Sequence, residues 1–275
     1  MTKHVYVARE ADENGEIHYS DHEHETWSIL IKRQKEAIKG RACEEYLKGI
    51  EILDFPEDRI PRWQDINEKL EKATGWGVEP VAAVIPALDF FNLLANKKFP
   101  AASFIRIREE LDYLEEPDLF HELFGHCPLL TNQAYADFME RYAKVALKVS
   151  AKQRNQLFRL FWFTIEFGLI KTSEGLKIFG GGILSSFEET LYALESKVPE
   201  RQPLEPLTAL RTPFRIDIKQ PVYFILENIN QLYSVLDDEI FNLMDKAKEL
   251  GDFPPKFEPK PKKKNLENKE SGYAY

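Results

Sequence analysis

The chain of 275 residues contains only two cysteines, Cys43 and Cys127. Two cysteines cannot build a disulfide framework, so we expect a reducing compartment, the cytoplasm. No apolar run approaches the roughly 20 residues that a membrane-spanning helix needs, and the polar first 16 residues have no apolar segment typical of a secretory signal. A formal net charge of −9 argues against nucleic acid and anionic membranes as partners.

The residues that are present predict a mainly α fold, α+β with a few short strands. With 43% hydrophobic residues the chain can bury the core of one large domain. Ser20 and Glu23 form a capping-box pattern, which predicts a helix that runs to residue 39 and ends at Gly40. Further helices are expected over residues 42–54, 62–74, 86–97, 118–126, 132–150, 153–171, 185–197 and 223–250. Short strands are expected over residues 78–85, 103–108 and 214–218, with a glycine-rich hairpin or bent loop over residues 175–183.

The chain divides into three parts by composition. Residues 1–18 are polar and form an N-terminal leader. Residues 19–250 hold the periodic segments and are expected to form a single domain. Residues 251–275 are rich in proline and lysine and poor in apolar residues, so we expect a flexible tail.

Histidine is unevenly distributed, because four of the six lie in the first 24 residues and only His121 and His126 follow. These two lie in the segment DLFHELFGHCPLL, residues 118–130. A zinc-peptidase helix also begins with His-Glu, but it needs its histidines at positions i and i+4. Residues five apart are separated by about 140° around an α-helix, so this pair can meet at one ion only if the helix deforms or ends between them. Gly125 and Pro128 favour an end near His126.

Two interpretations of the pair remain open from the residues alone. The histidines could be core residues with hydrogen-bonded neighbours, or they could bind a metal ion with a third ligand. Glu166 is the candidate, since it is the only acid in the apolar run over residues 157–170. A buried carboxylate is costly unless it is paired or bound to a metal, so an ion pair with Arg159 or another arginine is the competing interpretation. Two imidazoles and one carboxylate suit a non-haem Fe(II) site that activates oxygen.

Four segments together resemble a known family. They are VAAVIPALDFF, EEPDLFHELFGHCPLL, WFTIEFGL and GGGILSSFEE, and their order and spacing resemble the catalytic domain of the iron- and tetrahydropterin-dependent aromatic amino acid hydroxylases. The likeness covers about residues 19–250 and is strongest to the short bacterial type that acts on phenylalanine.

The resemblance implies a monooxygenase that converts L-phenylalanine to L-tyrosine with Fe(II), O2 and a tetrahydropterin. The alternatives are a tryptophan or tyrosine hydroxylase with the same chemistry, or a catalytically silent homologue. A cytoplasmic monomer or small homo-oligomer is expected.

The same resemblance assigns roles to individual residues. The catalytic Fe(II) ligands would be His121, His126 and Glu166. The pterin would meet Ala83, Ile85, Phe90 and Glu122. The substrate would meet Arg106, Asp118, Trp162, Phe167, Gly182 and Ser185, with Arg106 holding its carboxylate.

Some positions depart from the commoner pattern or leave a choice open. Alternation along a strand would put Arg108 on the same face as Arg106, so spacing does not choose between them. Phe158, Phe161 and Ala83 differ from the animal enzymes near the pterin. Ile216 lies where tyrosine hydroxylases tend to carry an acid, and an aliphatic residue there favours phenylalanine.

Overall fold

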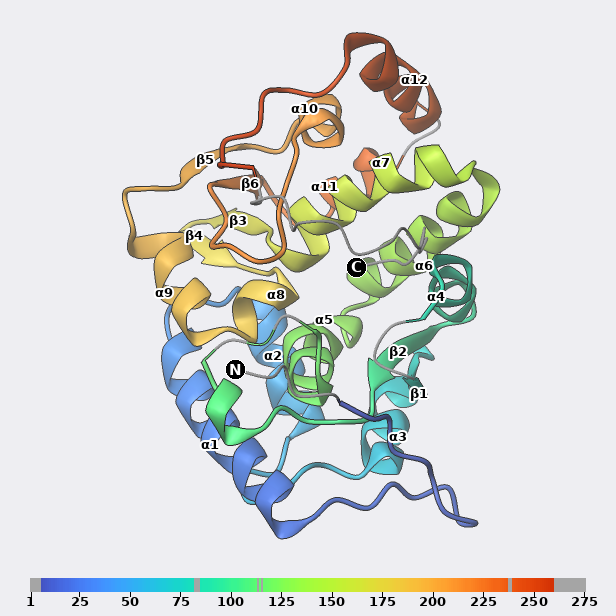
Figure 1. Cartoon of the computed structure of the whole chain (residues 1–275), viewed down its shortest axis with the longest axis vertical. Coiled ribbons are helices and arrows are strands. Elements are labelled where there is room, and N and C mark those ends of the chain that lie inside the picture. The colour runs from blue at the N-terminus through green and yellow to red at the C-terminus, as the bar shows by residue number, and fades with distance from the viewer. Residues whose placement is uncertain (1–5, 82–84, 113, 115, 237–238, 260–275) are drawn as a thin grey trace, which may run out of the picture.

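The computed structural model describes residues 6–81, 85–112, 114, 116–236 and 239–259. Three helices occupy the lower half of Figure 1, coloured blue to cyan: α1 (Asp21–Ile38), α2 (Glu44–Leu53) and α3 (Trp63–Thr74). Helix α1 begins at the capping box of Ser20 and Glu23, and α3 ends at Gly75, whose φ of 76° is left-handed. These helices confirm the sequence-based predictions closely because their end signals are local.

The upper half of the molecule is built from two longer helices and several short ones (Figure 1). Helices α6 (Gln133–Lys148) and α7 (Ala151–Phe161) follow each other there, and α4 (Ala87–Ala95) packs on α6. Helix α12 (Ile240–Leu250), at the top of Figure 1, is as long as α7. The short helices of the whole fold, of which α5 and η1 lie lower in the view, are α5 (Cys127–Leu130), α8 (Gly181–Leu184), α9 (Phe187–Glu195), α10 (Pro206–Arg211), α11 (Gln231–Val235) and the 3-10 turn η1 (Arg108–Glu110).

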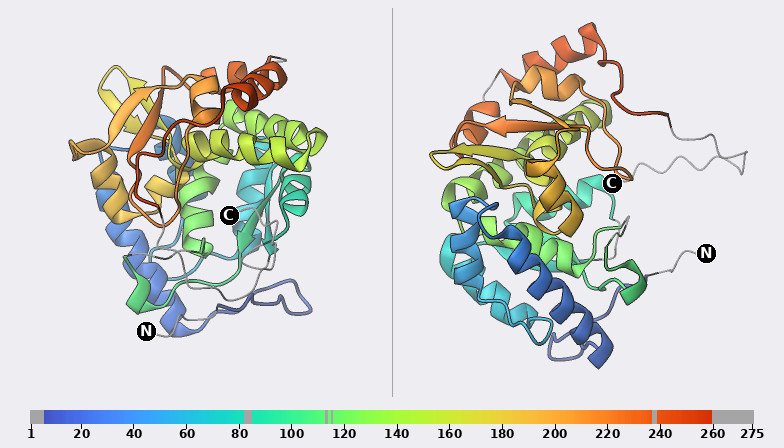
Figure 2. Two further views of the ribbon diagram at one scale, coloured as in Figure 1. Left: turned by 45° about the horizontal axis from the view of Figure 1, so that its top comes forward. Right: turned by 90° about the vertical axis from the view of Figure 1, so that its left-hand side faces the viewer.

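Two small sheets complete the fold. Strands β1 (Gly77–Val81) and β2 (Lys98–Ala102) pair in parallel, with α4 as their crossover. The second sheet has the order β4-β3-β6-β5 and contains β3 (Leu169–Thr172), β4 (Gly175–Ile178), β5 (Glu200–Pro203) and β6 (Val222–Leu226). Its β3–β4 pair is a hairpin that uses only the first part of the glycine-rich segment, and β3 lies where the end of a helix over residues 153–171 was expected. The later part of the glycine-rich segment forms α8, so the expected hairpin or bent loop over residues 175–183 is confirmed only in part. In the right-hand view of Figure 2 this sheet lies in the upper half, and α1 to α3 lie below.

Two π-helical segments lie between these halves: η2 (His121–His126) and η3 (Trp162–Glu166). A π-turn closes its hydrogen bonds from residue i to i+5 and is rare outside functional sites. The helix that carries the histidine pair was expected to end at His126, and this prediction is wrong. The helix widens over η2 and continues through α5 to Leu130. Pro128 cannot donate a backbone bond into this helix, and the carbonyl of Phe124, four residues before it, accepts from the hydroxyl of Tyr46 instead.

Other element predictions are wrong in place. Residues 103–108 form no strand, because their backbone groups bond elsewhere: Leu119 donates to the carbonyl of Phe104, and the amide of Arg106 donates to Asp118. Residues 214–218 form no strand either. Residues 223–250 are not one helix but β6, α11 and α12, since a short apolar run buried on both faces does not distinguish strand from helix.

One contiguous core joins most of these elements; η1 and β5 contribute no residue to it. Its largest fully buried side chains include Trp27, Trp76, Tyr46, Tyr135 and Tyr142. Tyr46 donates to the carbonyl of Phe124 in η2, Tyr142 to that of Leu157 and Trp27 to that of Pro56, so the polar ends of these three rings have partners. The fold class is confirmed as a mainly α single domain with a few short strands.

Candidate active site

The three predicted metal ligands meet at the ends of the two π-helical segments. His121 and His126 begin and end η2, and Glu166 ends η3. The Nε2 atoms of the two histidines are 3.0 Å apart. Glu166 Oε2 lies 3.4 Å from Nε2 of His126 and 3.7 Å from Nε2 of His121. The wider π-turn brings residues five apart to one side of the helix, which a regular α-helix does not.

This cluster fits a single metal ion. Ligand atoms bonded at about 2.1 Å to a six-coordinate ion are separated by about 3.0 Å from one another, close to the spacing found here. Glu166 is buried, and its Oε1 has no hydrogen-bond partner within the described residues. The competing ion pair with Arg159 is wrong, because Arg159 instead makes two bonds of 2.6 and 2.7 Å to Asp252. Two nitrogens and one oxygen, without thiolate, suit non-haem Fe(II).

The charges of the cluster already match those that a metal requires. Burial raises the pKa of Glu166, but the two neighbouring histidines lower it further, so its pKa lies below the ordinary value. Burial lowers the pKa of His121 to about 4. At neutral pH the carboxylate is therefore ionised and the His121 imidazole is neutral, as metal ligands must be.

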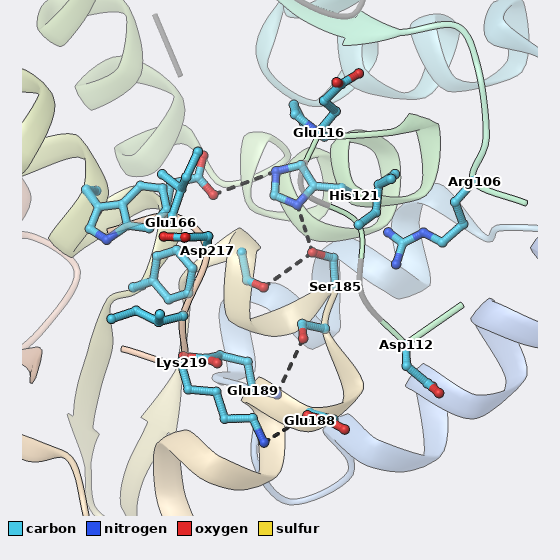
Figure 3. Close-up of a pocket in the computed structure, with 18 residues that line it drawn as sticks. Arg106, Asp112, Glu116, His121, Glu166, Ser185, Glu188, Glu189, Asp217 and Lys219 are labelled. Carbon is cyan, nitrogen blue, oxygen red and sulfur yellow. Dashed lines mark hydrogen bonds and ion pairs between the residues drawn. The ribbon is translucent and has the colours of Figure 1, made fainter. Parts of the chain in front are cut away.

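Ser185 fixes the tautomer of His121. The hydroxyl of Ser185 donates to the carbonyl of Gly181 over 2.9 Å, and its oxygen lies 2.9 Å from Nδ1 of His121. Because the hydroxyl proton is used on Gly181, the Ser185 oxygen accepts from Nδ1–H, and Nε2 keeps its lone pair for a metal. Figure 3 shows Ser185 and Glu166 on two sides of the His121 ring.

Replacing Ser185 by alanine is expected to lower iron affinity by roughly 10- to 100-fold, because the hydrogen bond that orients His121 is lost. Iron affinity is measured by titrating the metal-free protein and following bound iron. Ser150→Ala is the matched control, since that hydroxyl caps α7 by accepting from the amide of Gln153. It should reduce thermal stability and leave iron affinity unchanged. Equal affinities in wild type and Ser185→Ala would contradict the assigned tautomer.

Glycines let α8 approach the ligands directly. A Cβ on Gly181 would lie 2.5 Å from Nδ1 of His126, and a Cβ on Gly182 would lie 3.0 Å from Oε2 of Glu166. A Cβ on Gly125 would lie 2.6 Å from the carbonyl oxygen of Gly181. No side chain fits between α8 and η2 at positions 125 and 181, so these two positions require glycine, whereas a Cβ at position 182 would only crowd Glu166. The sequence reasoning singled out Gly182 and missed Gly181, although both belong to the GGG run of the recognised segment.

Asp118 ties Arg106 to the start of η2. Its carboxylate accepts from Nε and Nη2 of Arg106 at 2.8 and 2.9 Å, and from the Arg106 amide at 2.9 Å. It also accepts from the amide of His121 at 3.0 Å. Arg106 is only 8% exposed. Arg108, which strand alternation left open, is instead an exposed residue of η1 that pairs with Glu25. The structure therefore selects Arg106 as the buried arginine.

A cavity of about 370 Å³ opens beside the ligands. Arg106 lines one side of it, and His121 and Glu166 line another. The rings of Trp162 and Phe167, 4.5 Å apart, form an aromatic wall. Gly182 and Ser185 also line the cavity. Sequence reasoning did not single out these further lining residues: Asp112, Leu114, Glu116, Pro117, Ser186, Glu188, Glu189, Asp217, Ile218 and Lys219.

Of the residues predicted for the pterin, Ile85, Phe90 and Glu122 are described, and none of the three lines this cavity. Ala83 lies outside the described residues, and Ile85 is half-buried. Phe90 is 3% exposed and packs edge-to-face against Phe91 and Phe161. Glu122 is buried beside His121, and its Oε2 has no partner in the part of the chain described. Burial, with the charges of nearby carboxylates, raises the pKa of Glu122 well above its ordinary value.

Fold and site together define a mononuclear metal centre with two histidines and one carboxylate, the kind used by non-haem iron oxygenases. The family described as biopterin-dependent aromatic amino acid hydroxylase matches residues 1–248. The chain belongs to this family, and the resemblance found in its sequence is confirmed.

Relatives and solved structures agree. Phenylalanine-4-hydroxylase of Pseudomonas aeruginosa is 53% identical over 255 residues, covering 93% of this chain and 97% of that protein. The structure of phenylalanine hydroxylase from Legionella pneumophila matches with a TM-score of 0.90 and 49% identity, over 92% of this chain and 100% of that one. The Chromobacterium violaceum enzyme, solved with bound oxidized Fe(III), matches with a TM-score of 0.83 and 42% identity, over 86% of each chain. Within the described residues, no helix is long and apolar enough to cross a membrane.

Proposed function

We propose that this chain is a monooxygenase that hydroxylates L-phenylalanine to L-tyrosine with Fe(II), O2 and a tetrahydropterin. One observation carries the proposal: His121, His126 and Glu166 converge at a cavity that also holds a buried arginine and an aromatic wall. The family is biopterin-dependent, and relatives that are about half identical are phenylalanine-4-hydroxylases. When bound, iron and tetrahydropterin together supply the oxygen activation that no side chain can provide.

The protein's own contribution is to bind, orient and exclude water. His121, His126 and Glu166 would hold the iron by one face, so that its other positions remain available to ligands that are not protein side chains. Ser185 keeps the proton of His121 on Nδ1, away from the metal side. The buried position of His126 and Glu166 keeps bulk water from that side of the site.

Arg106 is the proposed partner of the substrate carboxylate. Asp118 occupies Nε and one proton of Nη2, which leaves three N–H donors of the guanidinium for a carboxylate. Because Asp118 is fully buried, it holds the guanidinium plane in place before substrate arrives. The aromatic ring of the substrate would then lie against Trp162 and Phe167, beside Glu166.

The pterin is proposed to bind on the segment around Ile85 and Phe90, on the side of Glu122. The unpartnered Oε2 of Glu122 is available to the polar edge of a pterin. Phe90 would offer its ring for stacking, and the backbone of Ala83 and Ile85 would meet the polar edge. These assignments follow the family resemblance, and substituting Glu122 by alanine tests them through the KM for the pterin.

The function is tested by incubating the purified protein with Fe(II), a tetrahydropterin and phenylalanine, tryptophan or tyrosine in separate reactions. Tyrosine formed from phenylalanine is the expected product. Ile216 lines the cavity and offers no acid to a substrate hydroxyl, which favours phenylalanine over tyrosine. Product from tryptophan or tyrosine alone would favour the alternative specificity, and no product from any of the three would indicate a silent homologue. Metal analysis of the same sample identifies the bound ion.

Three further expectations remain predictions. They are the bounds of the leader, catalytic domain and tail (residues 1–18, 19–250 and 251–275), a monomer or small homo-oligomer, and a cytoplasmic location. Light scattering on the eluting peak of a gel-filtration column measures the oligomeric state, and limited proteolysis locates the domain bounds. Cys43 and Cys127 are both buried free thiols, which is consistent with a reducing compartment.

A further inference from the structure

Gln220 is bonded to Trp162 of the aromatic wall and lies in the segment that leads into β6. Its side chain is fully buried, at 1% exposure, and every polar atom of its carboxamide is used. Oε1 accepts from Nε1 of Trp162 at 3.0 Å. Nε2 donates to the carbonyls of Arg215 and Ile218, both at 2.9 Å. One amide therefore joins the Trp162 wall to the segment of residues 215–218.

Trp162 at one end of this bridge and Ile218 at the other both line the cavity. Trp162 stands 4.5 Å from Phe167 on one side and stacks on Phe214 at 4.5 Å on the other. Residues 216–219 form the wall that continues from it. The two walls come from different elements, η3 and the segment before β6. Within the described residues, Gln220 is the side chain that bonds to both of them.

Glu189 holds Gln220 itself in place. Its Oε1 accepts from the backbone amide of Gln220 at 3.1 Å and from the hydroxyl of Tyr223. Glu189 sits in α9, whose start is capped by Ser186, and Glu188 beside it pairs with Lys219 at 2.8 Å. Glu189 of α9 therefore links the backbone of Gln220 to Tyr223 of β6. These bonds hold the backbone in place while the carboxamide bonds to the two walls.

The bonds of Gln220 cannot be replaced by water without movement. Removing its carboxamide would leave one indole N–H and two carbonyls buried without these partners, and each such group costs about 1–3 kcal/mol. The walls must then shift to find new partners. Because Trp162 and residues 216–218 all line the cavity, a shift between them would change the space for a substrate ring and would leave the metal ligands in place.

We propose that Gln220 is a positioning residue that sets the width of the ring pocket, and so favours a single-ring amino acid over a bicyclic one. The inference rests on the proposed function and deepens it. Gln220 acts through Trp162 and through residues 215–218, and it touches neither the substrate nor a metal ligand. Glu189 supports it by fixing its backbone.

The test uses the full chain loaded with Fe(II) and compares Gln220→Met, which keeps the volume, with Gln220→Asn, which keeps the amide but shortens its reach. Kinetics with phenylalanine and with tryptophan are measured, together with tyrosine formed per tetrahydropterin oxidised. Both variants are expected to raise the KM for phenylalanine on the order of tenfold. That factor corresponds to the net free energy of about one hydrogen bond. The tyrosine yield per tetrahydropterin should fall, and kcat/KM should shift toward tryptophan, while iron content stays at the wild-type level.

Asn67→Leu is the matched control. Asn67 also carries a half-buried amide that bonds to backbone, donating to the carbonyl of Val78 and accepting from its amide, but it joins α3 to β1 away from the cavity. It should lower thermal stability without changing the tyrosine yield. If Asn67→Leu changed yield and specificity as the Gln220 variants do, the effect would be general destabilisation and the assignment would be overturned.

A double-mutant cycle with Trp162→Phe separates the two arms of the bridge. In that background the indole donor is already absent, so Gln220→Met should raise the KM less than it does in the wild type. Unchanged KM and yield in folded Gln220 variants would overturn the proposal. If Gln220→Met fails to fold, Gln220→Asn carries the same comparison. A wild type that forms no tyrosine in the assay would instead overturn the proposed function.

Discussion

Replacing Glu166 by glutamine is expected to abolish stoichiometric iron binding and to lower tyrosine formation by at least about a thousandfold. The amide has the volume of the carboxylate but no charge, so the site loses the anionic ligand that balances the ion. A bound metal supplies several kcal/mol of stabilisation to reactions of this kind, and each 1.4 kcal/mol is about a factor of ten in rate. Iron per chain, measured after dialysis against excess Fe(II) and desalting, gives the direct reading.

A stability measurement separates loss of metal from loss of fold. Iron binds the folded protein and so raises the wild-type melting temperature, whereas Glu166→Gln should show no such rise. The metal-free variant is expected to melt close to the metal-free wild type, because glutamine fills the same buried space as glutamate. Wild-type iron content in Glu166→Gln would remove Glu166 from the ligand set.

Replacing Arg106 by lysine is expected to raise the KM for phenylalanine about a hundredfold. Lysine keeps the positive charge but lacks the guanidinium group. In the wild type that group binds Asp118 and still has N–H donors left for the carboxylate of the substrate. A hydrogen bond to a charged group contributes up to about 3 kcal/mol, which corresponds to roughly a hundredfold in affinity. Arg108→Lys is the matched control, since Arg108 is exposed and pairs with Glu25 on the surface. The control should leave KM unchanged; equal effects at both positions would refute the assignment of Arg106.

The same substitution should change the acid limit of stability. Burial raises the pKa of Asp118, but the charge and hydrogen bonds of Arg106 lower it by more, so the pKa lies below its ordinary value. A carboxylate with a lowered pKa contributes stability above its unfolded pKa and loses it as the pH falls through its folded pKa. With Arg106→Lys the lowering is smaller, so unfolding on acidification should begin at a higher pH than in the wild type.

Local signals in the sequence predict much of this fold. The ends of α1 and α3 follow from Ser20, Glu23 and Gly75, because caps and left-handed turns depend on the residue itself and its near neighbours. The metal ligands stand out for a different reason: His121, His126 and Glu166 are polar residues in apolar surroundings that burial alone does not favour.

What the sequence could not predict depends on contacts between distant segments. The π-turn of η2 has no local signature, and in the folded chain it lies against α8, where the glycines at 125 and 181 permit close contact. The alternation of apolar and polar residues over residues 103–108 resembles that of a strand. In the folded chain, however, Arg106 is buried and bonds to Asp118. Gln220 stands in the polar stretch RIDIKQP, and no spacing within that stretch marks it as the partner of Trp162.

The carboxylate of Asp118 has one more consequence, which concerns the energetic linkage of two binding events. It bonds on one side to the guanidinium of Arg106 and on the other to the backbone amide of His121. If a substrate carboxylate bound to Arg106 and Asp118 moved in response, the first turn of η2, which carries His121, would move with it. Linkage between two sites is reciprocal, so any factor by which the amino acid strengthens iron binding is the factor by which iron strengthens binding of the amino acid.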